Sequence, residues 1–193
     1  MDGIDQRADA LSDAMHRALT AHGDHCWLVL DPTVARTRER EALDELLREP
    51  VTIVGVSSPH PQLDDSAMPK LVAIDSTHPT GSRRLRASIE HALEELAPDA
   101  LRRQTGRYVC GWWCTPAELG STLALHLRRS LVLQLSNARS TFVRWHDPAV
   151  WWAAWSWLDE HQRAQLLGPS AVVWGFSPSG QWQTYAALSR ASD

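Results

Sequence analysis

Three cysteines and two nearby histidines are the residues of this chain whose types could support metal binding or nucleophilic chemistry. His22, His25 and Cys26 lie close together, and Cys110 and Cys114 form a second group. A structural metal site needs several ligands at set distances, and the chain has no Cys-x-x-Cys pair. A thiol among apolar residues, as at Cys26 and Cys110, is typically buried and unreactive, whereas Cys114 lies beside an expected helix start that favours a lowered pKa. We expect no metal, and keep a small cysteine-dependent hydrolase that uses Cys114 or Cys110 as an alternative function.

A second group, Arg144, His146 and Asp147, could form an acid–base cluster. Alternation along a strand places Arg144 and His146 on one face, whereas Asp147 precedes Pro148 and is needed to cap a helix. We favour a structural role, in which Arg144 forms a buried ion pair with a carboxylate that holds a hairpin against this helix. No Gly-x-Ser-x-Gly motif, phosphate loop or dinucleotide fingerprint occurs, and we predict no catalytic residue and no cofactor site.

The segment 140–169 positions this second group and contains five of the ten tryptophans. Residues 141–145 are typical of a strand, and Asp147-Pro148 predicts the start of a helix. Residues at helical spacing are expected to form its buried face: Val150, Ala154, Trp157 and Leu158. Asp159 with Gln162 is a capping signal for a second, short helix to residue 167, which Gly168 and Pro169 end.

The tryptophans of this segment raise a question of binding. Stepping along the first helix places Trp152 on its polar side together with Ser156, and tryptophan is enriched at the centres of protein interfaces. We therefore keep two interpretations of Trp152, core residue and partner contact, and predict Trp152 and Ser156 as candidate partner-binding residues. Core positions are expected for the other four tryptophans: Trp145, Trp151, Trp155 and Trp157.

Strands alternate with helices before this segment, and hairpins dominate later. Helices are expected at 5–21, 36–49, 83–96 and after a Thr-Pro-Ala-Glu capping box at 115–118, and strands at 26–30, 51–56, 71–75 and 107–113. Hairpins are expected around 137–139 and 178–180. The pattern predicts a single compact α/β (mixed α+β) domain with a mixed sheet, late β-hairpins and packed helices. We divide the chain into an N-terminal helix over 1–22, a domain over 23–190 and a tail over 191–193.

Composition limits the function further. The chain has 193 residues and a formal net charge of −4, so no basic excess is present to bind nucleic acid. No apolar run approaches the length of a membrane span, and the acidic N-terminus does not resemble a signal peptide. Three cysteines fit a reducing compartment, and we expect a cytoplasmic protein.

Several motifs together resemble one known family. The run Phe-Val-Arg-Trp-His-Asp-Pro at 142–148, the apolar helix after it and Leu-Gly-Pro at 167–169 are similar to the adaptor (effector-chaperone) domain of bacterial type VI secretion systems. The apolar strand that ends at Leu30-Asp31, the Gly-Trp pair at 111–112 and His-Leu-Arg at 126–128 extend the resemblance over about 27–182. His146 stands where the family more often has an aromatic residue, and Ala149 where it often has arginine.

The resemblance implies a non-enzymatic cytoplasmic adaptor. Such a protein binds a cognate toxic effector and helps to load it onto a VgrG-type spike, so the implied partners are the effector and the spike, with no nucleic acid and no membrane. It also implies that Arg144, Asp147, Pro148, Gly168 and Pro169 are structural motif residues. Besides the hydrolase, an immunity-like protein that binds a toxin to block it remains an alternative.

Overall fold

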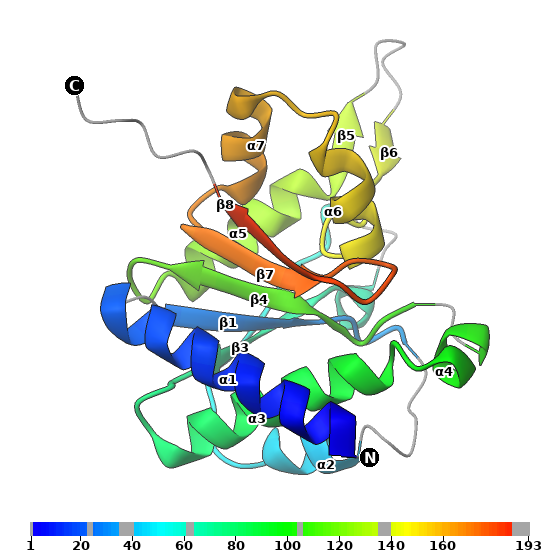
Figure 1. Cartoon of the computed structure of the whole chain (residues 1–193). Helices are drawn as coiled ribbons and strands as arrows, with labels where there is room; N and C mark the ends of the chain where they lie inside the picture. Colours follow the sequence, from blue (N-terminus) through cyan, green and yellow to red (C-terminus); the bar gives the residue numbers. More distant parts are fainter. Residues whose placement is uncertain are drawn as a thin grey trace.

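One six-stranded antiparallel sheet forms the centre of the protein (Figure 1). The computed structural model describes residues 2–22, 25–34, 41–60, 64–103, 106–134 and 140–186. The strands lie in the order β2-β3-β1-β4-β7-β8, and a separate hairpin pairs β5 with β6. The mixed α+β class is confirmed, but every strand pairing among these residues is antiparallel, so the sheet is not the mixed sheet expected from the sequence.

The strand bounds are β1 His25–Leu30, β2 Ile53–Gly55, β3 Lys70–Ile74, β4 Val109–Thr115, β5 Val132–Gln134, β6 Ser140–Phe142, β7 Val172–Phe176 and β8 Trp182–Ala186. The helices are α1 Asp2–His22, α2 Glu41–Leu46, α3 Pro79–Glu94, α4 Pro98–Arg103, α5 Gly120–Ser130, α6 Pro148–Trp155 and α7 Glu160–Leu167, with a short 3₁₀ turn η1 at Asp65–Ala67. Both late hairpins, β5–β6 and β7–β8, are therefore present. The predicted turn at 137–139, the predicted helix start at 36–40 and the predicted tail lie outside the described residues.

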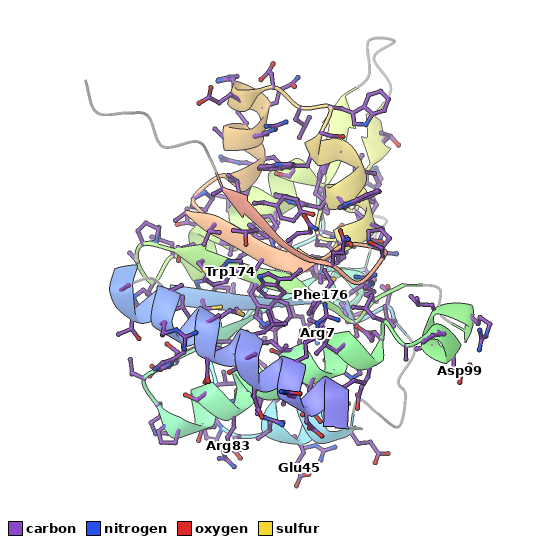
Figure 2. All side chains as sticks on the ribbon, in the orientation of Figure 1. Arg7, Glu45, Arg83, Asp99, Trp174 and Phe176 are labelled. Carbon is purple, nitrogen blue, oxygen red and sulfur yellow. The ribbon has the colours of Figure 1, made fainter. Side chains whose placement is uncertain are left out.

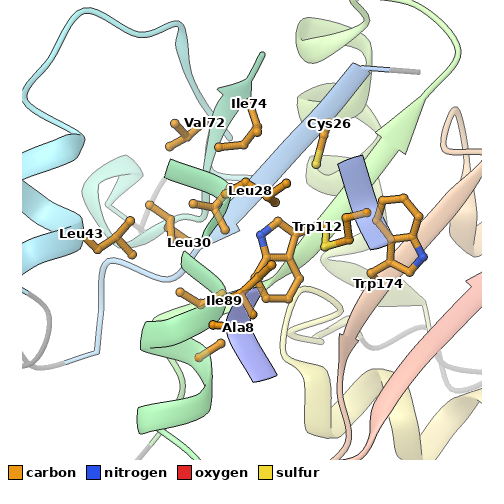
Figure 3. Packing of buried hydrophobic residues seen from close by; sticks show 14 of the residues in the cluster. Ala8, Cys26, Leu28, Leu30, Leu43, Val72, Ile74, Ile89, Trp112 and Trp174 are labelled. Carbon is orange, nitrogen blue, oxygen red and sulfur yellow. The ribbon is translucent and has the colours of Figure 1, made fainter. Parts of the chain in front are cut away.

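The central strand β1 is apolar on both faces because helices cover both faces of the sheet. Leu28 belongs to the core cluster beneath α1, α2 and α3, whereas Trp27 and Val29 belong to the cluster beneath α5, α6 and α7. Figure 3 shows the first cluster, in which Trp112 lies at the centre and donates its indole N–H to Ser88 Oγ at 2.9 Å. A strand buried on both faces has no polar alternation, which is why β1 was recognisable from its continuous apolar run.

Helix α1 is fastened to the first layer by charged as well as apolar contacts. Its buried residues Ala8, Met15 and Leu19 face α3 and the sheet. The guanidinium of Arg7 lies 5.5 Å from the centre of the Phe176 ring and donates to the backbone carbonyl of Gly180 at 2.6 Å (Figure 2). These contacts join α1 to the last hairpin of the sheet. No helix in the described ranges is long and apolar enough to cross a membrane.

The predicted capping box at Thr115 is wrong. Thr115 is the last residue of β4, paired with His25 of β1, and its hydroxyl donates to the Ala117 carbonyl at 2.5 Å. Helix α5 begins only at Gly120, where a Cβ atom would lie 2.4 Å from the Trp27 ring. Gly120 packs directly against the Trp27 ring, and the helix therefore begins there and not at the local capping signal.

Candidate partner-binding surface

The start of α6 follows its sequence signal. The carboxylate of Asp147 accepts a hydrogen bond from the backbone N–H of Ala149 at 2.9 Å, and Pro148 occupies the first turn, where it is buried. The cap satisfies an N–H group that has no partner inside the helix. Both predicted motif residues thus lie where they fix the direction in which α6 leaves the β5–β6 hairpin.

Helix α7 also begins and ends as predicted. Asp159 accepts from Gln162 N–H at 2.8 Å, and the Gln162 side chain accepts from Asp159 N–H at 2.9 Å, which completes a capping box. Gly168 ends the helix at φ 59°, and a Cβ there would lie 2.5 Å from the His126 ring. His126 Nε2 donates to the Leu166 carbonyl at 2.8 Å, and burial lowers the pKa of this histidine. Pro169 follows, half-buried.

The buried face of α6 differs from the predicted one. Trp151 is 3% exposed, and its ring packs edge-on against Trp113 of β4, at 5.0 Å between centres, and against Tyr185 of β8. Trp155 stacks on Trp151 at 5.6 Å and is covered by the guanidinium of Arg163. The predicted core position of Trp157 is wrong, because this side chain is 87% exposed. Two strands that are distant in sequence supply the aromatic partners, and they select the Trp151 face of α6.

The outward face of α6 is consequently apolar. A shallow groove of about 590 Å³ runs along it, lined by Ala149, Val150, Ala153, Ala154 and Trp157. Trp152, which precedes Ala153 in the helix, is 50% exposed, and Ser156, the residue that caps the helix, is also exposed. Both candidate partner-binding residues therefore point away from the core. We call this face, comprising Ala149, Val150, Trp152, Ala153, Ala154, Ser156 and Trp157, the α6 surface.

Sequence reasoning missed the groove itself. The signal was present in Ala149, Ala153 and Trp157, which are spaced by four residues and hence share one side of a helix. Further exposed apolar side chains, Val132 and Phe142, lie on the β5–β6 hairpin, which projects from the same end of the molecule as α6 (Figure 1). Exposed apolar residues gathered on neighbouring elements are typical of protein interaction sites.

Arg144 does pair with a carboxylate, that of Asp31 at the end of β1. Asp31 is 1% exposed, and its other oxygen accepts from the backbone N–H and the hydroxyl of Thr33 at 2.9 and 2.5 Å. His146 Nε2 lies 3.6 Å from the same carboxylate. Burial raises the pKa of Asp31, but the hydrogen bonds from His146 and Thr33 and the charge of Arg144 outweigh it and lower this pKa to about 2. The cluster ties segment 140–169 to the sheet and leaves no carboxylate oxygen free for acid–base work.

The three thiols offer little to nucleophilic chemistry. Cys26, Cys110 and Cys114 are buried and form no disulfide, and burial raises the pKa of Cys110 well above its ordinary value. Cys114 lies inside β4 and not at a helix start. Among the residues whose placement is described, no group of three His, Cys, Asp or Glu side chains could hold a metal ion; His22, which the sequence offered as a candidate ligand, has no described side chain.

A second hollow lies where β1, β3 and the first turns of α3 meet. It has a volume of about 680 Å³, and the buried Arg84 lines it. Arg84 donates to the backbone carbonyls of Leu46, Glu49 and Pro50 at 3.0 to 3.1 Å. This guanidinium therefore holds the turn after α2 against α3, which is a structural use of its charge.

Comparison with protein-family models places most of this architecture in one family. Residues 26–165 match the model described as Domain of unknown function (DUF4123). The chain belongs to the DUF4123 family. The matched DUF4123 range includes Asp31, Arg144 and the whole α6 surface, whereas α1 and the β7–β8 hairpin lie outside it. No curated protein and no solved structure matched the chain.

Proposed function

We propose that the protein is a non-enzymatic adaptor that binds a cognate type VI secretion effector in the bacterial cytoplasm and helps to load it onto a VgrG-type spike. The family match and the resemblance of 142–148 and 167–169 to effector-chaperone domains support this role. The observation that carries the proposal is the α6 surface. It presents two exposed tryptophans and small apolar residues on a helix that is capped and packed firmly against the sheet.

The energetics of binding favour such a surface. Burying an exposed tryptophan and its apolar surroundings yields a large share of the free energy of association, and a rigid helix loses little conformational entropy when it binds. The stacking of Trp151 on Trp155 and the cap at Asp147 keep the helix fixed before the partner arrives. An adaptor requires these properties and needs no catalytic group.

Affinity capture of the tagged full-length protein from its native cells tests the proposal, with mass spectrometry of the proteins that accompany it. Recovery of a large toxin-domain protein, together with secretion of that toxin only when the adaptor gene is intact, is the expected result. Recovery of neither toxin nor spike under conditions of active type VI secretion would overturn the proposal. Protection of cells from the toxin with no effect on secretion would favour the immunity-like alternative instead.

A further inference from the structure

We propose that the groove of the α6 surface binds an α-helix of the cargo protein. This helix carries an apolar ridge of large aliphatic side chains and a basic residue at the end that lies beside Asp159 and Glu160. The inference rests on the proposed adaptor function and adds to it the secondary structure and the chemistry of the segment that is recognised.

The shape of the groove suits a second helix. Ala149 and Ala153 lie one turn apart, Val150 and Ala154 form a parallel row beside them, and Trp157 closes the C-terminal end of the groove. Small side chains in two such rows leave a depression between larger neighbours, into which the ridge of a facing helix can pack. Trp152 does not line the groove but is 50% exposed on the same helix, so a partner that extends past Ala149 would bury it as well.

Hydrogen bonding favours a helix over an extended strand as the occupant. The backbone N–H groups of this face already have partners: Ala149 donates to Asp147, and Trp157 donates to the Ala154 carbonyl at 2.9 Å. A strand gains affinity by pairing its main chain with an exposed sheet edge, and α6 offers no such edge. A segment that enters an apolar groove must therefore satisfy its own backbone groups, as a helix does.

Charge complementarity places a basic residue at one end of the bound helix. Asp159 and Glu160 are exposed just beyond Trp157, at the C-terminal end of α6. Of the two arginines of segment 140–169, Arg144 pairs with Asp31, and Arg163 donates to the Trp155 carbonyl at 3.1 Å and carries one positive charge against these two carboxylates. This end of the groove thus presents negative charge, which attracts a lysine or arginine and repels an acidic nucleic acid or an anionic membrane.

Site-specific photo-crosslinking tests the geometry. The photoreactive amino acid benzoylphenylalanine replaces Ala149 or Ala153, one at a time, in the full-length protein in its native cells. Crosslinked peptides are then sequenced by mass spectrometry. The expected result is that both positions crosslink one segment of the captured effector, at residues three or four apart. Sites two residues apart would indicate a strand and overturn the inference, as would crosslinks to a second copy of this chain.

A groove-filling substitution supplies an independent measurement. Ala153→Leu adds bulk to the exposed groove without touching the core, and we expect it to weaken capture of the effector about tenfold or more. Ala14→Leu is the matched control, because Ala14 is an exposed alanine on α1, in the layer beneath the opposite face of the sheet. Equal capture by both variants, each with an unchanged thermal unfolding midpoint, would overturn the inference.

The outcomes separate this inference from the function on which it rests. The wild-type protein could capture its effector and affect secretion while no crosslinks form and Ala153→Leu leaves capture unchanged. In that case the adaptor function stands and the groove is not the site. If the wild-type protein captures no effector at all, the adaptor function fails, and the inference fails with it.

Discussion

The guanidinium of Arg144 donates a hydrogen bond to the carboxylate of Asp31, a residue that precedes it by 113 positions in the chain. Asp31 directly follows the central strand β1, and its backbone N–H donates to the Tyr108 carbonyl at 2.9 Å. Arg144 lies between β6 and α6. The pair therefore connects the middle of the sheet with the segment that carries the α6 surface, and the orientation of this surface depends on it.

Arg144→Ala should lower the free energy of unfolding by about 2 kcal/mol, because it leaves the buried Asp31 carboxylate without its cation. The effect falls short of that of a fully buried pair, since the Arg144 side chain is 37% exposed. Urea unfolding followed by circular dichroism measures the change. The control is Arg102→Ala, which breaks the solvent-exposed Arg102–Asp99 pair and should have little effect. Equal stability of both variants and the wild type would contradict a structural role for Arg144.

The free energy of unfolding should depend on the ionisation of Asp31 at acidic pH. Its pKa in the folded protein is about 2, below the ordinary value of 3.8, so the unfolded chain binds the proton more readily. The contribution of Asp31 to the free energy of unfolding is therefore complete above about pH 4 and is lost as the pH falls through about 2. Its amplitude is about 1 to 2 kcal/mol, because solvent screens the partly exposed Arg144. Urea unfolding of Asp31→Asn and of the wild type should be measured between pH 6 and 2. The difference between their free energies of unfolding should become smaller as the pH falls through this window. A constant difference would show that the charge of Asp31 does not matter.

Trp152→Ala should weaken capture of the effector without unfolding the protein, because Trp152 is half exposed and makes no ring contact within the described core. Truncating a tryptophan at an interface hot spot costs about 2 kcal/mol or more of binding free energy. Leu101→Ala is the control, since Leu101 is exposed to a similar degree on the distant helix α4. Normal capture by a folded Trp152→Ala variant would remove this residue from the interface.

Gly168→Ala should destabilise the protein by about 2 kcal/mol or more, because Gly168 has φ 59° and its missing Cβ would lie 2.5 Å from the His126 ring. Gly3→Ala provides the contrast, since nothing lies within 4 Å of a Cβ at that helical position. There alanine should stabilise slightly through its higher helix propensity. Thermal unfolding midpoints measure both changes. A harmless Gly168→Ala would mean that the α7 end can relax away from His126.

The cysteines should resist alkylation in the folded protein. Cys26, Cys110 and Cys114 are buried, and burial raises the pKa of the Cys110 thiol, so little thiolate is accessible at neutral pH. Reaction with iodoacetamide, followed by mass spectrometry, should be slow in buffer and complete in urea. Rapid loss of an enzymatic activity on alkylation of the folded protein would instead favour the cysteine hydrolase.

Local signals in the sequence were reliable where a few neighbouring residues decide the structure. The Asp147-Pro148 start, the Asp159–Gln162 capping box and the Gly168 stop are contacts within one turn, and the structure contains all three. The same kind of signal failed at Thr115, because the ladder between β1 and β4 recruits this residue into a strand. A cap is worth about 1 kcal/mol, less than the strand pairing and burial that compete with it.

The sequence by itself determined most of the strands and the starts of α6 and α7: continuous apolar runs indicated the buried strands, and caps indicated where the two helices begin, whereas α4 was not predicted and α5 was predicted to start too early. Only the tertiary structure decided which side of α6 faces the core and which carboxylate accepts from Arg144. Trp151 and Trp157 are equally apolar, so periodicity cannot rank them; the positions of Trp113 and Tyr185 on the folded sheet bury the first and leave the second exposed. Asp31 likewise meets Arg144 only when β1 lies at the centre of the sheet, because contacts between residues distant in sequence depend on how the layers pack.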